Sequence, residues 1–180
     1  MQRTRPVPQL PAFPTGPIRF FALDVETANS DVGSICQLGV ACVLDSGAIL
    51  TWGCHVDPGT VRFSNSWLHG ITARHCIGAP RIGAVIDHLN PHLSGRTVYQ
   101  HSSFDQRAIR AASAALGRSE PDWGWQDSVK VARAAWPELK GNGGHGLGNL
   151  KKVLGLNFEH HDAIEDARAA AMVVLMAAQA

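Results

Sequence analysis

Hydrophobic residues fall into short runs that predict strands first and helices later along the chain. Apolar runs rich in β-branched and aromatic residues predict three strands over residues 18–25, 35–44 and 48–56. A turn signal, Asp45-Ser46-Gly47, separates the second run from the third, so these two strands are predicted to form an antiparallel hairpin. A three-stranded meander therefore opens the domain.

Strands and helices alternate in the rest of the chain. Apolar residues at helical spacing and alanine-rich runs predict helices over 82–93, 104–116, 128–135 and 149–154, and from Asp162 to near the end, with short strands at 97–100 and 123–126. The glycine-rich segment 141–148 is predicted to be a mobile loop. This order predicts an α/β fold with a mixed five-stranded sheet, antiparallel then parallel, flanked by helices.

The length fits one domain, which we place at residues 18–180, after a flexible proline-rich leader over 1–17. The leader lacks the apolar stretch of a signal peptide, and the apolar run 169–180 is shorter than the roughly 20 residues of a membrane span. We therefore predict a cytoplasmic protein with no membrane association. The leader segment Gln9–Phe13 loosely resembles peptides that dock on sliding clamps, although a plain linker is the simpler interpretation.

The net charge is too small to identify a partner. The chain has 16 basic and 15 acidic residues, for a formal charge of +1. A strongly basic surface, the usual sign of a nucleic-acid-binding protein, is therefore not evident from composition alone.

The first predicted strand ends in a pair of carboxylates. In Asp24-Val25-Glu26 both acids point to the same face of the strand, because side chains alternate with a period of two. Two adjacent anions repel each other unless a cation lies between them. Asp105 at a helix start and Asp166 in the last helix, with His161 just before it, are further candidates, and an all-oxygen set of this kind favours Mg²⁺ or Mn²⁺ over zinc.

Three segments resemble the motifs of the DEDDh exonucleases, the DnaQ-like family that includes proofreading subunits of replicative polymerases. FFALDVETANSDVGSICQLGVACV is similar to the first motif, VYQHSSFDQRAI to the second, and HDAIEDARAAA to the third in its His-x4-Asp form. The segment LHGIT, residues 68–72, resembles another recurrent piece. The resemblance runs from about Ile18 to Leu175.

The resemblance implies an RNase H-like fold and a metal-dependent 3′–5′ exonuclease. Asp24, Glu26, Asp105 and Asp166 would hold two Mg²⁺ or Mn²⁺ ions, and His161 would be the general base. Two divalent ions suit phosphodiester hydrolysis, which needs neutralisation of developing charge and an activated water, and a histidine titrates in the right range to accept the proton. The substrate would be the 3′ end of single-stranded nucleic acid, with DNA favoured and nucleoside 5′-monophosphates released. Thr27, His69, His101 and Phe104 are the candidate substrate contacts.

Several alternatives stay open at this point. His160 rivals His161 as the base, and Asp162 rivals Asp166 as a ligand, although a helix cap is its more usual role. Trp67 and Trp125 could stack on bases, although packing is the more usual role of lone aromatic residues. Many family members have His-Asn where this chain has Gln100 and His101, which affects only the contacts to the terminal nucleotide.

The sequence also leaves the substrate and the assembly open. An exoribonuclease and a non-catalytic polymerase-associated module are the alternative functions. Association as a homodimer, or with a polymerase or sliding clamp, is equally open. If the four carboxylates are metal ligands, the 15 acidic residues fall to 11 against 16 basic ones, so the metal-loaded protein would be cationic and its binding to nucleic acid sensitive to salt.

Overall fold

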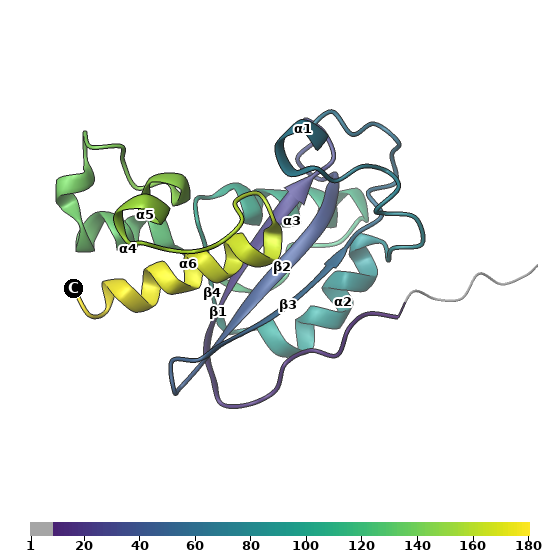
Figure 1. The fold of residues 1–180 in the computed structure, drawn as a ribbon. Helices are drawn as coiled ribbons and strands as arrows, with labels where there is room; N and C mark the ends of the chain where they lie inside the picture. The colour runs from purple at the N-terminus through teal and green to yellow at the C-terminus, as the bar shows by residue number, and fades with distance from the viewer. Residues whose placement is uncertain (1–8) are drawn as a thin grey trace, which may run out of the picture.

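The computed structural model describes residues 9–180, and its centre is one five-stranded mixed sheet (Figure 1). The strand order is β3-β2-β1-β4-β5, with β1 antiparallel to β2 and parallel to β4. The strands are β1 (Ile18–Thr27), β2 (Ile35–Leu44), β3 (Ile49–His55), β4 (Thr97–Gln100) and β5 (Gly124–Asp127). The predicted α/β architecture is confirmed.

The helices cover both faces of this sheet. They are α1 (Ser66–His69), α2 (Ile82–Leu93), α3 (Phe104–Ala115), α4 (Ser128–Ala135), α5 (Leu147–Val153) and α6 (Ala163–Ala177), with a short 3₁₀ helix η1 (Pro137–Leu139). In Figure 1, α6 crosses in front of the sheet, while α2 and α3 lie behind it. No helix in the described residues is long and apolar enough to span a membrane.

Successive side chains of β1 point to opposite faces of the sheet, and this decides which of them contact the helices on each face. Phe21, Leu23 and Val25 point into the main core, where they pack with α2 and α3. Phe20 and Ala22 point to the other face and pack against α6. The side chains that follow them on this second face are Asp24 and Glu26, so both carboxylates lie on the face that α6 covers.

The beginning of α6 lies directly on β2, because the strand has a glycine where the helix crosses it. Gly39 is the register partner of Asp24, and a Cβ atom at Gly39 would collide with the backbone carbonyl of Ala163. The same close approach repeats on β3, where a Cβ at Gly53 would meet the side chain of Ile164. These two glycines let the first turn of α6 reach the level of Asp24.

The segment before β1 packs onto the domain, whereas the sequence predicted a flexible leader as far as Pro17. Phe13 is buried, with its ring stacked on His92 at a centroid distance of 4.2 Å, and Trp52 donates a 3.0 Å hydrogen bond to the carbonyl of Pro11. Residues 1–8 lie outside the described chain. The aromatic residue of the clamp-like peptide is thus inside the core and is not exposed to a partner.

Two short helices in the described chain, α1 and η1, were not predicted. The helix α1 has only four residues and buries none of them, so it has no apolar period to detect. The 3₁₀ helix η1 has only three residues. The predicted helix over 149–154 is present as α5, which starts at Leu147, inside the segment predicted to be a glycine-rich loop. The other predicted elements are present with ends that differ by two residues or fewer.

Candidate active site

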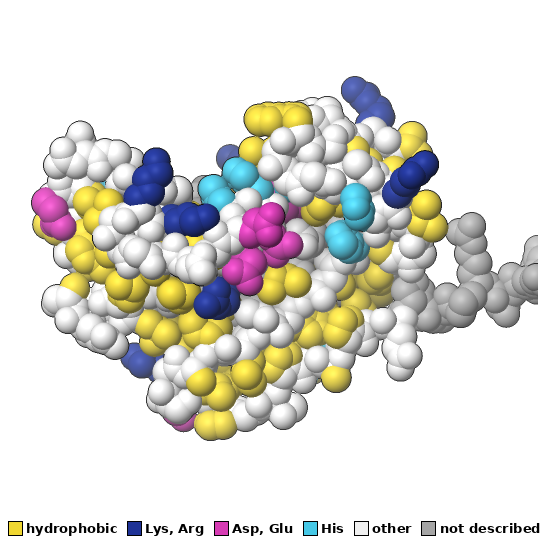
Figure 2. All heavy atoms as spheres, viewed as in Figure 1, with side chains coloured by type: hydrophobic (Ala, Val, Ile, Leu, Met, Phe, Trp, Pro, Cys, Tyr) yellow, Lys and Arg dark blue, Asp and Glu magenta, His cyan; other side chains and the backbone are white. Residues whose placement is uncertain are grey.

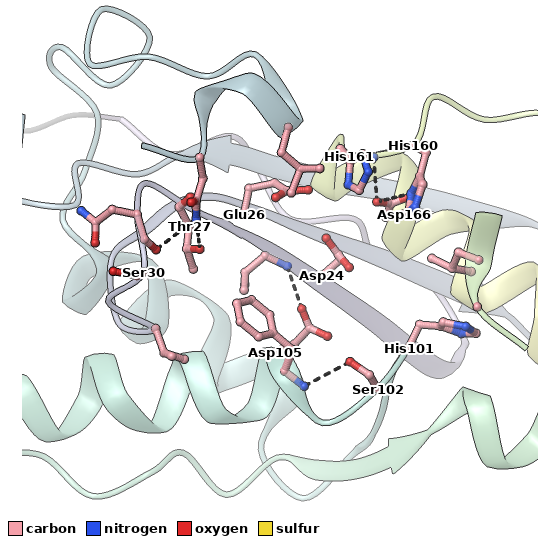
Figure 3. A pocket seen from close by; sticks show the side chains of 18 residues that line it. Asp24, Glu26, Thr27, Ser30, His101, Ser102, Asp105, His160, His161 and Asp166 are labelled. Atoms are coloured by element: carbon pink, nitrogen blue, oxygen red, sulfur yellow. Dashed lines mark hydrogen bonds and ion pairs between the residues drawn. The ribbon is translucent and has the colours of Figure 1, made fainter. Parts of the chain in front are cut away.

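Three carboxylates from two elements meet at the end of β1. Asp24 and Glu26 come from the strand and Asp166 from the first turn of α6, and each offers an oxygen atom within 4.8 Å of the others. Figure 2 shows acidic side chains gathered in one patch in the middle of this face, with histidines on both sides. Figure 3 shows Asp24, Glu26 and Asp166 around the same cavity. Oxygen-only groups at this separation are suited to hold a divalent cation of the Mg²⁺ or Mn²⁺ type.

The position of Asp166 is fixed by a cap at the start of α6. The Asp162 carboxylate accepts hydrogen bonds from the backbone N–H groups of Ile164 and Glu165 at 3.0 and 3.1 Å. Asp162 is therefore an N-cap, which is the more usual role that the sequence indicated for it. It lies outside the carboxylate triad.

Gln37 joins this cap to the sheet. Its side chain donates to Asp162 at 3.1 Å and accepts from the backbone N–H of Ala163 at 3.0 Å. Sequence reasoning missed Gln37, although it is a polar residue in an otherwise apolar strand, which is the signal that could have found it. Gln37 thus holds the helix that carries Asp166 against the strand next to Asp24.

Asp105 lies beside the triad without belonging to it. Its buried carboxylate accepts a 3.0 Å hydrogen bond from the backbone N–H of Val25, and Figure 3 shows this bond below Asp24. The Gln100 side chain accepts from the N–H of Gln106 at 2.9 Å and so caps the start of α3. The fourth predicted carboxylate is therefore at the site, bound to the strand that carries the first two.

Burial and mutual repulsion favour the protonated form of these carboxyl groups. Desolvation raises the pKa of Asp24 well above its usual range, and the neighbouring carboxylates raise it further. Desolvation, followed by repulsion from Asp166 and Asp105, raises the pKa of Glu26 to about 8. The pKa of Asp105 is also raised, mainly by burial. Within residues 9–180 no Lys or Arg forms an ion pair with any of the four, so a bound cation would relieve the repulsion.

Both candidate histidines line the cavity, but their hydrogen bonds differ. His160 Nδ1 lies 2.8 Å from one Asp166 oxygen, whereas His161 contacts Asp166 through its backbone N–H at 2.9 Å. No hydrogen bond to either ring nitrogen of His161 is present in the described chain. The two rings stack at a centroid distance of 3.9 Å. Burial lowers the pKa of His161, as does the adjacent His160, so its imidazole is neutral and able to accept a proton.

The cavity is an open cleft with a volume of about 530 Å³, and its lining includes apolar and neutral polar side chains beside the acidic ones. Val32, Leu68 and Phe104 provide apolar surface there. Thr27 is part of the lining, and the polar residues Asn29, Ser30 and Asn65 line it as well. The cleft therefore combines charged groups with apolar and hydrogen-bonding surface.

The two histidines predicted to contact substrate have both ring nitrogens engaged within the protein. His69 lies outside the main cleft, in an adjoining hollow, where its Nε2 bonds the carbonyl of Thr27 at 3.0 Å and its Nδ1 accepts from Ile71. His101 lines the main cleft, with Nδ1 2.8 Å from the Ser128 hydroxyl and Nε2 2.8 Å from the carbonyl of His145. Both therefore position neighbouring backbone through their nitrogens.

The bond from His101 also explains how the glycine-rich segment becomes part of the site. His145 is held from its other side by a 2.8 Å bond between its Nε2 and the carbonyl of Trp136. The next two residues, Gly146 and Leu147, line the cleft. His101 thus joins the end of β4 to the loop that forms one wall.

Solved structures with similar folds include several nucleases. The chain matches "Exonuclease X in complex with 5' overhanging duplex DNA" with a TM-score of 0.67 and 24% identity, covering 87% of this chain and 90% of the other. It matches the nuclease domain of 3'hExo, described as a DEDDh family member bound to rAMP, with a TM-score of 0.73 and 17% identity over 89% and 91%. The match to E. coli Exonuclease I with a dT13 oligonucleotide has a TM-score of 0.70 and 17% identity over 87% and 40%. At these identities the likeness shows a shared fold.

The sequence itself identifies the family. A comparison with curated protein sequences gave no match. The model of the RNase_T family, described as an exonuclease, matches residues 21–174, which include every carboxylate described above. The chain therefore belongs to the RNase_T exonuclease family and is a hydrolytic exonuclease.

Proposed function

We propose that this exonuclease removes nucleotides one at a time from the 3′ end of single-stranded nucleic acid, with DNA favoured, and releases nucleoside 5′-monophosphates. The observation that carries the proposal is the arrangement of Asp24, Glu26 and Asp166 with two histidines at one end of an open cleft. Nucleases of similar fold have been solved with a DNA oligonucleotide, an overhanging duplex and rAMP, all consistent with chain ends or their products.

The carboxylates would hold two Mg²⁺ or Mn²⁺ ions. The triad offers oxygen atoms within 4.8 Å of one another, and Asp105 lies next to it with one oxygen already bound to the Val25 N–H. When bound, the ions supply positive charge opposite the scissile phosphate and favour deprotonation of water. Without them the cleft repels a phosphate, so substrate binding should depend on metal.

His161 would accept the proton from the attacking water. Its imidazole is neutral because burial lowers its pKa, and neither ring nitrogen has a hydrogen-bond partner in the described chain. His160 is the alternative base, with one nitrogen already bound to Asp166 and the other available. A positioned general base contributes about 10²–10⁴-fold to the rate.

The apolar part of the cleft lining would receive the terminal nucleoside. Phe104, Leu68 and Val32 offer apolar surface to a base, and Asn29 and Asn65 also line the cleft. An exoribonuclease is the second candidate, because one nuclease of similar fold holds rAMP and another is a 3′-exonuclease described as recognising the 3′ end of a histone mRNA stem-loop. A binding module without catalysis would not require the complete set of carboxylates and histidine.

A digestion series tests the proposal. DNA and RNA single strands, duplexes and dinucleotides, each labelled at the 5′ end, are incubated with Mg²⁺, Mn²⁺ or EDTA, and the products are separated by size. We expect a ladder that shortens from the 3′ end, and no cleavage in EDTA. Cleavage unaffected by EDTA, or products cut from the 5′ end, would contradict the proposal.

Matched variants connect that activity to the site. Asp24→Asn and Asp166→Asn should each abolish cleavage while the circular dichroism spectrum stays unchanged. Asp45→Asn, at an exposed carboxylate in the β2–β3 turn, should keep full activity and serves as the control for loss of charge alone. Near-normal cleavage by both cleft variants would rule out the assigned metal site.

The assembly of the protein remains a prediction. Association with a second copy, or with a polymerase or sliding clamp, can be tested by light scattering and by pull-down with purified partners. Because Phe13 is buried against His92, a clamp contact through this residue would require residues 9–17 to detach. Phe13→Ala should therefore lower the melting temperature, whether or not a clamp binds.

A further inference from the structure

One tryptophan has no packing role in the described chain. Trp67 exposes 80% of its surface, whereas Trp52 and Trp123 expose 3% and 4%. It lies on α1, a four-residue helix without buried residues. The sequence left both base stacking and packing open for Trp67, with packing the more usual role, and its exposure argues against packing. An indole held in water on a short helix contributes little to the fold, so its surface is available to a ligand.

The helix that carries Trp67 is bound tightly to the catalytic strand. The side-chain amide of Asn65, just before α1, donates to the carbonyl and hydroxyl oxygens of Thr27 at 3.1 and 3.2 Å and to the carbonyl of Asn29 at 3.0 Å. At the other end of α1, His69 bonds the carbonyl of Thr27. Thr27 directly follows the metal-site residue Glu26. The helix that carries Trp67 is therefore held in a fixed position relative to the proposed metal site.

The surface of α1 is continuous with the cleft. Leu68, the residue after Trp67, is 39% exposed and lines both the main cleft and the adjoining hollow that contains His69. In Figure 2, hydrophobic surface lies over α1 at the rim above the acidic patch. A strand whose terminal nucleotide occupies the cleft can thus continue over this rim without a gap in apolar contact.

The charge around α1 favours a polyanion as the occupant. Residues 57–81 contain three arginines and a single acidic residue, Asp57. Asp57 pairs with Arg81 at 3.4 Å, and no ion pair of Arg62 or Arg74 is present in residues 9–180. The carbonyl of Arg62 accepts from Asn29, so this arginine belongs to the same network as Asn65 and α1. An exposed indole with cationic neighbours is the combination that binds single-stranded nucleic acid by stacking and phosphate contact.

We propose that Trp67 is a stacking platform for an unpaired base of the substrate strand, outside the nucleotide that is being removed. This inference rests on the proposed function, since it needs a single strand in the cleft. A flat aromatic ring can stack on any base, so Trp67 would add affinity for single strands without selecting a sequence. A base already paired in a duplex has no free face to offer, so the platform would favour unpaired ends.

The test combines a variant with a substrate that lacks the bases. Affinity is measured by fluorescence anisotropy with Ca²⁺ in place of Mg²⁺, for a labelled single strand and for the same strand with abasic sites upstream of its 3′ nucleotide. Trp67→Ala should weaken binding of the normal strand about 5- to 150-fold and have little effect on the abasic strand. Trp67→Phe, which keeps a ring, should recover part of the affinity.

Controls separate this inference from the proposed function. Ile77→Ala removes an equally exposed apolar residue, 81% accessible, which does not line the cleft, and it should bind both strands like the wild type. Equal effects of Trp67→Ala on the normal and abasic strands, or no effect on either, would overturn the stacking role. If the wild type neither cleaves nor binds any single strand, the proposed function itself fails.

A spectroscopic signal gives a second readout. The exposed Trp67 indole should be quenched when a single strand stacks on it, and the difference between wild type and Trp67→Phe isolates its emission from the other four tryptophans. Unchanged difference emission at saturating strand would also contradict the inference. If α1 instead binds a protein partner, Trp67→Ala should not change the anisotropy with nucleic acid. Added single strand should then not change the Trp67 emission either.

Discussion

The backbone N–H of Val25 donates a 3.0 Å hydrogen bond to the carboxylate of Asp105, 80 residues away in the chain. Val25 lies between Asp24 and Glu26 in the strand. The bond therefore links the strand that carries these two carboxylates to the carboxylate of Asp105. Asp105 therefore satisfies a buried donor and also places negative charge next to the triad. These two roles can be separated by substitution.

We predict that Asp105→Asn and Asp105→Leu both lose activity at least about 100-fold, because both remove a charge from the proposed metal site. Their stabilities should differ. Asparagine keeps an oxygen that can accept from the Val25 N–H, whereas leucine leaves that buried donor unsatisfied at a cost of about 1–3 kcal/mol. Thermal melts of the two variants measure the difference. Identical melting temperatures would show that the hydrogen bond contributes nothing to stability.

The repulsion within the site predicts how stability depends on pH and metal. The pKa of Glu26 is raised from 4.5 to about 8, so the folded metal-free protein binds this proton more tightly than the unfolded chain. The resulting stabilisation is complete below pH 4.5 and is lost as the pH rises through about 8. We expect the melting temperature in EDTA to fall across this range.

A divalent ion should reverse that loss. Excess Mg²⁺ is expected to raise the melting temperature more at the alkaline end of the range than at the acidic end, because protonated carboxyl groups bind the ion poorly. Glu26→Gln should flatten the pH dependence in EDTA, and Asp45→Asn should not. A Mg²⁺ effect that is equal at both ends would contradict the assigned electrostatics.

The pH dependence of the rate distinguishes the two histidines. Since the pKa of His161 lies below 6.5, kcat should rise with pH and level off above that pKa. His161→Ala should lower kcat by about 10²–10⁴-fold and remove the acidic limb, while His160→Ala should retain the limb. The reverse pattern in single-turnover rates would assign the base to His160.

The bridge through His101 predicts a local change in dynamics. His101→Ala removes the 2.8 Å bond to the carbonyl of His145, which should loosen the segment from 141 to Leu147 that forms one wall of the cleft. Hydrogen exchange in this segment should speed up, and KM should rise more than kcat falls. The exposed Lys130→Ala on α4 is the control. Unchanged exchange in the segment would show that the loop is held by other contacts.

The features that were predictable from the sequence depend on the periodicity of side chains within one element or on the chemistry of neighbouring residues. Asp24 and Glu26 share a face because side chains on a strand alternate, and Asp162 was identifiable as a cap because it precedes an apolar helical run. The mixed sheet, antiparallel and then parallel, followed from a hairpin and then alternating strands and helices. Such features need no knowledge of distant contacts.

The features that escaped prediction depend on contacts between distant segments. Gln37 joins α6 from 125 residues away, and His101 joins the glycine-rich loop from 44 residues away. The burial of Phe13 depends on Trp52 and His92, which belong to different elements. Nothing in the sequence around these residues encodes their partners.

The place of α6 in the chain has a consequence for synthesis of the enzyme. The triad joins Asp24 to Asp166, and the latter is carried by the last helix. While the chain is being translated, Asp24, Glu26 and Asp105 emerge long before the residue that completes their site. If these carboxylates form the metal site as proposed, a nascent chain should lack nuclease activity until α6 has left the ribosome and packed on Gly39. An unfinished enzyme would then be unable to degrade nucleic acid in its surroundings.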